Sequence, residues 1–439
     1  MRKKLSALFG KFPELKIAFS LSEWETDFLR FFQSMTNYNI SKQSISLHTT
    51  IYQDKKSYSF DLKDPKIEQV EAKIAEAQKI IPNLPADPDF VDLEDDSRIA
   101  EPLTKSNNIQ LVDLEQKTAI LKHLSQIAAQ YNFKIFGTFI CNYSTQTILN
   151  SNGVDKKQHF SPIYFECKAV SDANQVTVLE VFGGEDFSKF QLEKFAQSLE
   201  EKMSAASSEV VDVPAGKYDV ILAPRCIGEY FRYLSGSMEA AALDNGQSFF
   251  EGKIDGKVFP ENITLTDSPL ADELINFSYN PEGHLYQTTP IIENGVFKNF
   301  LVGNYYGRKL KLTKNGAEGM ALVLQSGDKT LAEMISGIKH GLYISSLHYM
   351  NFINPKETSV TGLTRDGTFL IEDGKITKVV NNLRFTEKIS DIISEIYALE
   401  NQNHPVPFSS NYGEFEIVSF SMPHVAVKNF QITSSTQTI

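Results

Sequence analysis

Short turn signals between apolar runs constrain the fold of this chain more than any other feature. Asn-Gly stands between apolar flanks in Ile291-Ile-Glu-Asn-Gly-Val296, and Asp-Gly takes the same place in Leu370-Ile-Glu-Asp-Gly-Lys375. A further Asn-Gly occurs in Asn150-Ser-Asn-Gly153. These dipeptides favour tight hairpins because their residues tolerate the positive φ that such turns require. The sequence therefore predicts antiparallel strand pairs in both halves of the chain.

The first half combines alternating runs with helical periodicity. Residues Gln43 to Tyr52 and Ser57 to Leu62 alternate polar and apolar side chains, which predicts a hairpin. A capping-box spacing at Ser22-Glu-Trp-Glu25 predicts that a helix begins there. Three strands are expected over 133–149, 160–170 and 175–182, and three helices over 66–81, 114–130 and 187–203. We therefore expect an α+β domain over residues 1–213, with an antiparallel sheet flanked by helices.

After Pro214 the pattern shifts toward strands. Gly and Asn/Asp turns recur at short intervals, and helical spacing is confined to 228–243, 331–339 and 388–399. The sequence predicts a second domain over residues 214–439, mainly antiparallel β with a few helices. The fold class expected for the whole chain is thus α+β.

Charge and hydropathy exclude two kinds of partner. The chain has 439 residues and a formal net charge of −12, which argues against a general nucleic-acid binder, because such a protein usually presents a basic face. A local basic patch stays open as an alternative. It has no run of about 18 apolar residues, so no membrane-spanning helix is expected. Three separated cysteines support neither a disulfide framework nor a thiolate zinc site. We expect a cytoplasmic protein.

Residues 82–105 differ in composition from their surroundings. They include Asn83-Leu-Pro-Ala-Asp-Pro-Asp-Phe-Val-Asp-Leu-Glu-Asp-Asp96, which is rich in proline and carboxylates. The central Gly and the terminal Glu of a calcium-binding EF-hand loop are missing. We interpret this stretch as a solvated connecting segment.

A search for catalytic motifs leaves few candidates. None of the eight histidines is followed directly by Glu or by a second His four or five residues later. His340 and His348 form the closest pair, but Leu342-Tyr-Ile344 between them predicts a strand. Cys226 would need a nearby His to act as a nucleophile. A stand-alone hydrolase that uses Cys226 or the His340/His348 pair remains an alternative on this evidence.

Several collinear segments resemble the TldD/PmbA family. The resemblance is weakest over the first 60 residues. No single segment is diagnostic of the family, but the order of the segments along the chain is diagnostic. The segments are Leu149-Asn-Ser-Asn-Gly153, Tyr218-Asp-Val-Ile-Leu-Ala-Pro224, Asn245-Gly-Gln-Ser-Phe249, Phe259-Pro-Glu-Asn-Ile-Thr-Leu-Thr-Asp-Ser-Pro269, Tyr279-Asn-Pro-Glu-Gly283, Pro290-Ile-Ile-Glu-Asn-Gly295, Asn304-Tyr-Tyr-Gly-Arg-Lys309, Gly341-Leu-Tyr-Ile344 and Phe369-Leu-Ile-Glu-Asp-Gly-Lys375.

The resemblance implies a two-domain protein that forms dimers. In that family the TldD branch resembles a zinc peptidase with a His-Glu-x-x-x-His helix and a Cys ligand near the C-terminus. The TldE/PmbA branch lacks the motif and pairs with TldD to cut unfolded or modified peptides. An older family label is modulator of DNA gyrase, which leaves a non-enzymatic regulatory role as a further alternative.

The present sequence departs from the catalytic branch at every metal position. Phe231, Arg232 and Gly236 stand where His, Glu and His would be, and no Cys follows Leu399. Phe and Gly offer no side-chain ligand atom, and the Arg cation would repel a divalent metal ion. The resemblance therefore implies a TldE/PmbA-like subunit with no cofactor of its own, so that zinc would belong to a TldD-like partner.

The matching segments also suggest where an extended peptide substrate would bind. By position, the candidates are Glu282, His284, Tyr305 and Arg308. A β-rich domain can hold an extended peptide through backbone hydrogen bonds, with little demand on its sequence. The expected partners are such a peptide and a TldD-like catalytic subunit, a second copy of this chain, or both.

Overall fold

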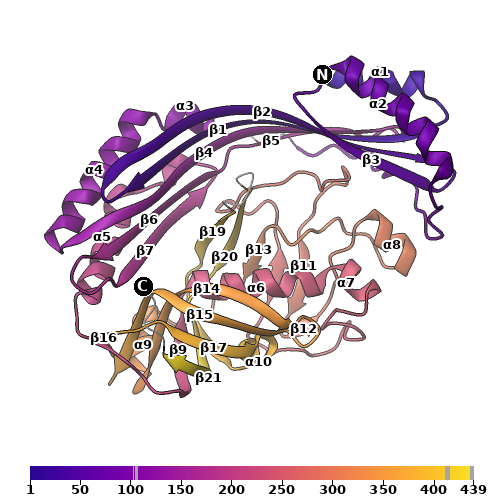
Figure 1. Cartoon of the computed structure of the whole chain (residues 1–439). Helices are drawn as coiled ribbons and strands as arrows, with labels where there is room; N and C mark the ends of the chain where they lie inside the picture. Colours follow the sequence, from indigo (N-terminus) through magenta and orange to yellow (C-terminus); the bar gives the residue numbers. More distant parts are fainter. Residues whose placement is uncertain (102, 104–106, 411–415, 436–439) are drawn as a thin grey trace.

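The first part of the chain builds one long antiparallel sheet. The computed structural model describes residues 1–101, 103, 107–410 and 416–435. The strand order is β3-β2-β1-β4-β6-β7, with β5 paired to β4, and the sheet arches over the rest of the molecule in Figure 1. Its strands are β1 (Lys16–Phe32), β2 (Met35–Gln53), β3 (Lys56–Lys63), β4 (Phe133–Asn150), β5 (Asp155–Phe160), β6 (Ile163–Ser171) and β7 (Thr177–Gly184).

The prediction of a helix from Ser22 is wrong, because Ser22 lies in the middle of β1. Residues 17, 19 and 21 alternate with partly exposed neighbours, and Ile17, Phe19 and Leu21 are buried. β1 is paired along its length by β2 on one side and by β4 on the other. Those two ladders of backbone hydrogen bonds outweigh the local capping-box preference.

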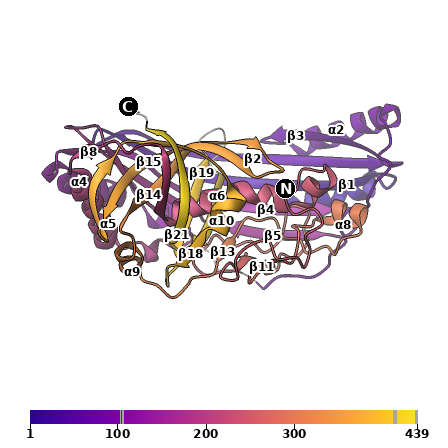
Figure 2. The same cartoon turned by 90° about the horizontal axis from the view of Figure 1, so that it is seen from below.

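Helices cover the two ends of this sheet. α1 (Arg2–Lys11) and α2 (Ile67–Ile80) lie at one end, while α4 (Leu114–Gln130) and α5 (Leu192–Ala206) lie at the other (Figures 1 and 2). Each pair buries its apolar stripe in its own core, one with β1 and β2 and one with β4 and β6. The shorter helices of this part are η1 (Ile81–Asn83), α3 (Asn108–Leu111) and η2 (Phe187–Lys189).

The second part packs two further sheets around one apolar core. One has the order β14-β9-β21-β17-β15-β16-β8, with β18 paired to β21, and the other runs β12-β11-β10-β13-β20-β19. The strands are β8 (Val210–Val211), β9 (Gly216–Leu222), β10 (Leu265–Asp267), β11 (Thr289–Glu293), β12 (Val296–Phe297), β13 (Leu322–Leu324), β14 (His340–Asn354), β15 (Ser359–Glu372), β16 (Lys375–Val380), β17 (Leu383–Lys388), β18 (Ile396–Leu399), β19 (His404–Ser410), β20 (Glu416–Met422) and β21 (Val425–Ser435).

Turn chemistry anticipated this second part well. Both predicted hairpins form, as β11–β12 and β15–β16, and the expected helix over 388–399 is half right because α10 gives way to strand β18. The helix expected over 228–243 divides at Glu239, whose backbone is extended. The helices here are α6 (Pro224–Met238), α7 (Ala240–Asp244), α8 (Asn304–Leu310), α9 (Leu331–Ser336) and α10 (Ile389–Ser394).

The two parts meet where edge strand β7 of the long sheet faces edge strand β19. A Cβ added to Gly183 would lie 2.3 Å from the Pro407 Cβ, so only glycine allows this approach. Phe369 and Val379 of the second part also enter the core under α4 and α5. The fold is α+β with mainly antiparallel sheets, as expected, and in the described residues no helix is long and apolar enough to cross a membrane. The domain division near Pro214 stays a prediction.

Candidate functional site

Helix α6 carries Phe231, Arg232 and Gly236, the three positions where the resemblance leads us to expect the metal motif of the family's catalytic branch. It begins directly after strand β9, and Pro224 occupies its first turn, where a missing N–H costs nothing. One face of the helix is mainly apolar and packs into the core between the two later sheets. Gly228 lets β19 and β20 approach closely, because a Cβ there would already lie 3.2 Å from both Phe408 and Val406.

The three motif positions cannot hold a metal ion. Phe231 is fully buried in the core, and Gly236 is exposed with open space beside it. The Arg232 guanidinium lies 5.2 Å from the Phe408 ring centroid and 3.9 Å from Glu229. This set offers one cation and no ligand nitrogen, sulfur or carboxylate, so the residues do not fit the zinc that the family's catalytic branch would hold.

The alternative catalytic candidates are not assembled into a site. Cys226 is buried in the core, its Sγ donates to the carbonyl of Ile344 at 3.3 Å, and burial raises its thiol pKa far above the usual range. A thiol in that state is not a nucleophile at neutral pH. His340 and His348 lie on the same strand, β14, eight residues apart, which corresponds to roughly 25 Å.

A cavity of about 400 Å³ opens at the start of α6, between the long sheet and the later sheets. Its lining includes the first turn of α6, part of β7 and α5, and residues of β14 and β15. Lys202 and Glu180 form an ion pair of 2.6 Å in its wall. His404 and His424 also line this cavity.

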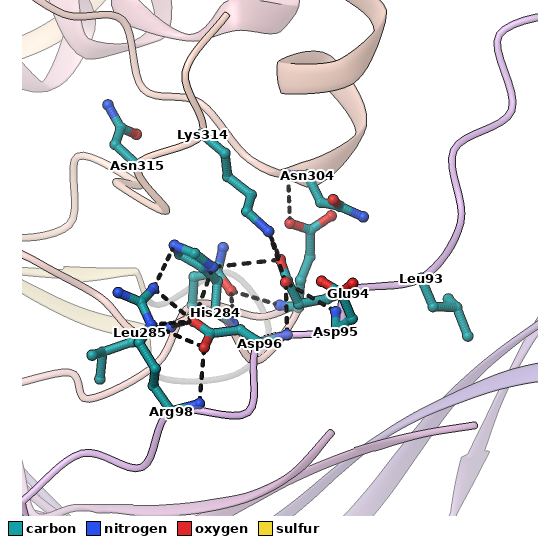
Figure 3. A network of polar contacts seen from close by, with 12 residues as sticks. Leu93, Glu94, Asp95, Asp96, Arg98, His284, Leu285, Asn304, Lys314 and Asn315 are labelled. Carbon is teal, nitrogen blue, oxygen red and sulfur yellow. Dashed lines mark hydrogen bonds and ion pairs between the residues drawn. The ribbon is translucent and has the colours of Figure 1, made fainter. Parts of the chain in front are cut away.

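Part of the segment between α2 and α3 is docked against the protein, which corrects our interpretation of residues 82–105 as solvated at Glu94 and Asp96; residues 102 and 104–106 lie outside the described residues. Glu94 is 3% exposed, and the side chain of Asp96 is 6% exposed. Figure 3 shows both carboxylates directed toward His284, whose Nδ1 lies 3.1 Å from Asp96 and 3.6 Å from Glu94. Composition suggested solvent exposure, but docking against the second part supplies cations and amides that composition does not reveal.

Glu94 and Asp96 are saturated with donors. Lys314 Nζ lies 2.7 Å from both oxygens of Glu94, and Arg98 donates to Asp96. The backbone N–H of Leu285 also donates to Asp96 at 2.9 Å. Burial alone would raise the pKa of Glu94, but hydrogen bonds from His284 and Lys314 outweigh it and lower the pKa to about 2. These groups form a charged clasp between the segment and the second part.

The four predicted peptide-binding residues fall into two neighbouring groups. His284 is buried in the clasp, and Glu282 accepts a hydrogen bond of 2.8 Å from the backbone N–H of Asn304. That bond fixes the first turn of α8, which carries Tyr305 and Arg308 one turn apart. Arg308 is exposed and Tyr305 is half-buried. Glu282, Tyr305 and Arg308 thus lie at or beside the first turn of α8, whereas His284 already contacts Glu94 and Asp96. A role of the four residues in peptide binding stays a prediction.

Sequence reasoning missed one cluster of polar side chains. Glu400, His404 and His424 place their ligand atoms within 4.8 Å of one another. The pair Glu400/His404 has a spacing of four residues, but His424 comes from the far side of the β19–β20 hairpin. A search for pairs of histidines at helical spacing does not find such a set.

Comparison with known proteins agrees with the fold. The family described as the PmbA/TldA metallopeptidase C-terminal domain matches residues 215–434. The solved structure of TldE from Thermococcus kodakarensis superposes with a TM-score of 0.87 and 18% identity, covering 98% of this chain and 100% of that one. The chain belongs to the PmbA/TldD family.

Curated relatives carry protease names. A metalloprotease from Methanothermobacter thermautotrophicus is 24% identical over 232 residues, which are 50% of this chain and 51% of the relative. A zinc metalloprotease TldD homolog from Saccharolobus solfataricus is 26% identical over 242 residues, or 50% of this chain and 52% of the relative. The matches thus span about half the length of these relatives.

Proposed function

We propose that this chain is a TldE/PmbA-like subunit of a TldD-type metalloprotease and does not itself carry the catalytic metal of that system. One observation supports the proposal: Phe231, Arg232 and Gly236 of α6, the positions that the resemblance matches to the metal motif of the catalytic branch, offer no side-chain metal ligand. Phe231 is part of the core, so the helix serves packing where a peptidase would need an open metal site.

The substrate class follows from the same resemblance. Unfolded or modified peptides suit a protein rich in strands, because an extended peptide can be held through its backbone. In this proposal Tyr305 and Arg308 on α8 contact the peptide, while Glu282 holds the start of α8 in place. The catalytic partner supplies the metal and the base that activates water.

Co-purification provides the first test. The tag-free chain is co-expressed with a TldD-like protein that contains His-Glu-x-x-x-His, and the mixture is separated by size-exclusion chromatography. We expect a stable hetero-oligomer. If this chain elutes only with copies of itself at every partner concentration, the heteromeric proposal is wrong.

Hydrolysis of an unfolded polypeptide such as casein provides the second test. We expect no cleavage by this chain alone, cleavage by the mixture, and loss of cleavage when the motif Glu of the partner is replaced by Gln. Cys226→Ser in this chain serves as the matched control and should leave cleavage unchanged. Cleavage by the isolated chain would contradict the proposal.

The metal content of the purified chain does not by itself distinguish a non-catalytic subunit from a hydrolase that acts alone. The cluster of Glu400, His404 and His424 contains none of the motif positions of α6, so a metal held there says nothing about peptidase chemistry on that helix. The deciding readout is therefore the cleavage of peptide.

A further inference from the structure

Three side chains from three separate segments meet at one point of the second part. Glu400 follows strand β18, His404 begins β19, and His424 lies in the turn between β20 and β21. The Glu400 Oε2 lies 2.8 Å from His404 Nε2 and 2.6 Å from His424 Nδ1. Two imidazole nitrogens and one carboxylate oxygen therefore converge within 4.8 Å.

We propose that Glu400, His404 and His424 bind one divalent transition-metal ion, with zinc as the ion that the ligand set fits. Two histidines and one carboxylate are a known protein ligand set for zinc sites that keep a further coordination position open. The same combination also serves non-haem iron. All three residues lie within the region that the family model matches, 215–434, but none of them is one of the three motif positions on α6.

The surroundings of His424 match those of a metal ligand. Its Nδ1 faces Glu400, and its Nε2 lies 3.1 Å from the hydroxyl of Tyr343 on β14. A metal-bound histidine usually has a hydrogen-bond partner for its second ring nitrogen, which fixes the orientation of the ring. Tyr343 provides that partner, and its ring lies 6.0 Å from that of His424.

The backbone holds the three ligands on rigid elements. The Glu400 N–H donates to the carbonyl of His424 at 2.9 Å, and the N–H of Gly327 donates to the Glu400 carbonyl at 2.7 Å. A Cβ at Gly327 would lie 2.4 Å from the Leu399 carbonyl oxygen, so this close approach requires glycine. Glu400 and His424 lie just outside strands, and these backbone hydrogen bonds hold them in place next to β18 and β21.

A simple ion pair explains the cluster less well. Among the residues that the structure describes, no Lys or Arg nitrogen lies within 4.0 Å of the Glu400 carboxylate. Glu400 is 7% exposed and His424 is 8% exposed, so the carboxylate is taken from water beside two imidazoles and, in the described part of the chain, no lysine or arginine pairs with it. A divalent ion would supply the charge compensation that a buried carboxylate requires.

The open coordination position would face the cavity at the start of α6. Both histidines line that cavity of about 400 Å³, which has room for a water molecule or a small ligand group. Tetrahedral zinc with bonds of about 2.0–2.1 Å separates its ligand atoms by about 3.4 Å. The Glu400 Oε2 lies 2.8 and 2.6 Å from the two imidazole nitrogens, so binding would lengthen these separations by about 0.6 and 0.8 Å and replace the hydrogen bonds between them.

Metal stoichiometry tests the proposal on the full chain. Tag-free protein is stripped with a chelator, dialysed against Zn²⁺ and analysed by inductively coupled plasma mass spectrometry. We expect one zinc per chain, and a visible spectrum typical of nitrogen and oxygen ligation when Co²⁺ is used as the probe. Less than 0.1 zinc per chain overturns the proposal when the Zn²⁺ concentration is about 10 µM. This concentration is well above the dissociation constant expected for a site whose ligands are already in place.

Substitutions assign the ligands. His404→Ala should weaken zinc binding at least tenfold, and its side chain is 35% exposed, so the variant is expected to fold. His340→Ala is the matched control, an exposed histidine on β14 whose loss should leave binding unchanged. Tyr343→Phe should weaken binding about tenfold through the orientation of His424. Wild-type affinity in folded His404→Ala and Glu400→Gln variants would contradict the assignment.

Discussion

Carboxylates contact imidazoles in two clusters of this molecule, one around His284 and one around Glu400, and the two clusters differ in the charged residues that surround them. At His284 the carboxylates of Glu94 and Asp96 are also held by Lys314 and Arg98 (Figure 3). At Glu400 the partners are two imidazoles, and the cluster borders a cavity. The residue types are nearly the same in the two places, but the neighbouring charges are not.

That difference separates a structural clasp from a ligand site. A carboxylate already compensated by a lysine or arginine gains little from a metal ion, and the resident cation would repel one. A buried carboxylate compensated only by imidazoles can exchange protons for a metal, because imidazole is a ligand when neutral. The four predictions below test this contrast, from the largest expected effect to the smallest.

Acid should destabilise the clasp through Glu94. Its pKa is lowered from 4.5 to about 2 in the folded protein, which corresponds to about 3 kcal/mol. A depressed carboxyl pKa gives stability that is present above pH 4.5 and is lost as pH falls through about 2. Urea unfolding of wild type and Glu94→Gln at pH 7, 4 and 2.5 should show the weaker pH dependence in the variant. Equal pH dependence would show that Glu94 is not held as the clasp requires.

Zinc should stabilise the Glu400 cluster and leave the clasp unaffected. Free Zn²⁺ at 100 times its dissociation constant raises the free energy of unfolding by about 2.7 kcal/mol if it binds only the folded chain. Thermal melts should show that gain in wild type and in Lys314→Gln, and its absence in His404→Ala. If the stabilisation by zinc disappears in Lys314→Gln, the metal binds at the clasp and not at the Glu400 cluster.

Removing the lysine of the clasp should cost about 2 kcal/mol. Breaking a buried ion pair from one side costs about 3–5 kcal/mol, and the partial exposure of Lys314, at 25%, lowers that cost. Lys314→Gln is compared with Lys122→Gln, an exposed lysine on α4, by urea unfolding. Equal stability of the two variants would mean that solvent already compensates Glu94.

The smallest effect concerns helix α6, which has no metal ligand at the three expected motif positions. Gly236→Ala on α6 should raise the free energy of unfolding by about 0.5–1 kcal/mol, because alanine is the better helix former and a Cβ there meets nothing within 4 Å. The zinc stoichiometry should not change. A loss of zinc in this variant would connect α6 with metal binding and would weaken the distinction from the Glu400 cluster.

Local chemistry predicted much of the fold. The Asn-Gly and Asp-Gly turns gave the hairpins β11–β12 and β15–β16, and the apolar spacing of α4 gave its observed bounds, 114–130. Local chemistry failed at Ser22, where pairing with β2 and β4 overrides a helix-start signal. The candidate site was harder to predict from the sequence, because Glu94 contacts His284 only when the segment docks on the second part.

The sequence by itself determined which chemistry is absent from α6. No fold can give Phe231 or Gly236 a side-chain ligand atom, so the loss of the motif can be read from the residues alone. Only the tertiary structure decided where carboxylates and imidazoles meet. Glu400 and His424 are 24 residues apart and belong to different strand ends, and the pairing of β18 and β21 brings them together. Periodicity reports the nearest neighbours along the chain, whereas a ligand site depends on which strands become neighbours in a sheet.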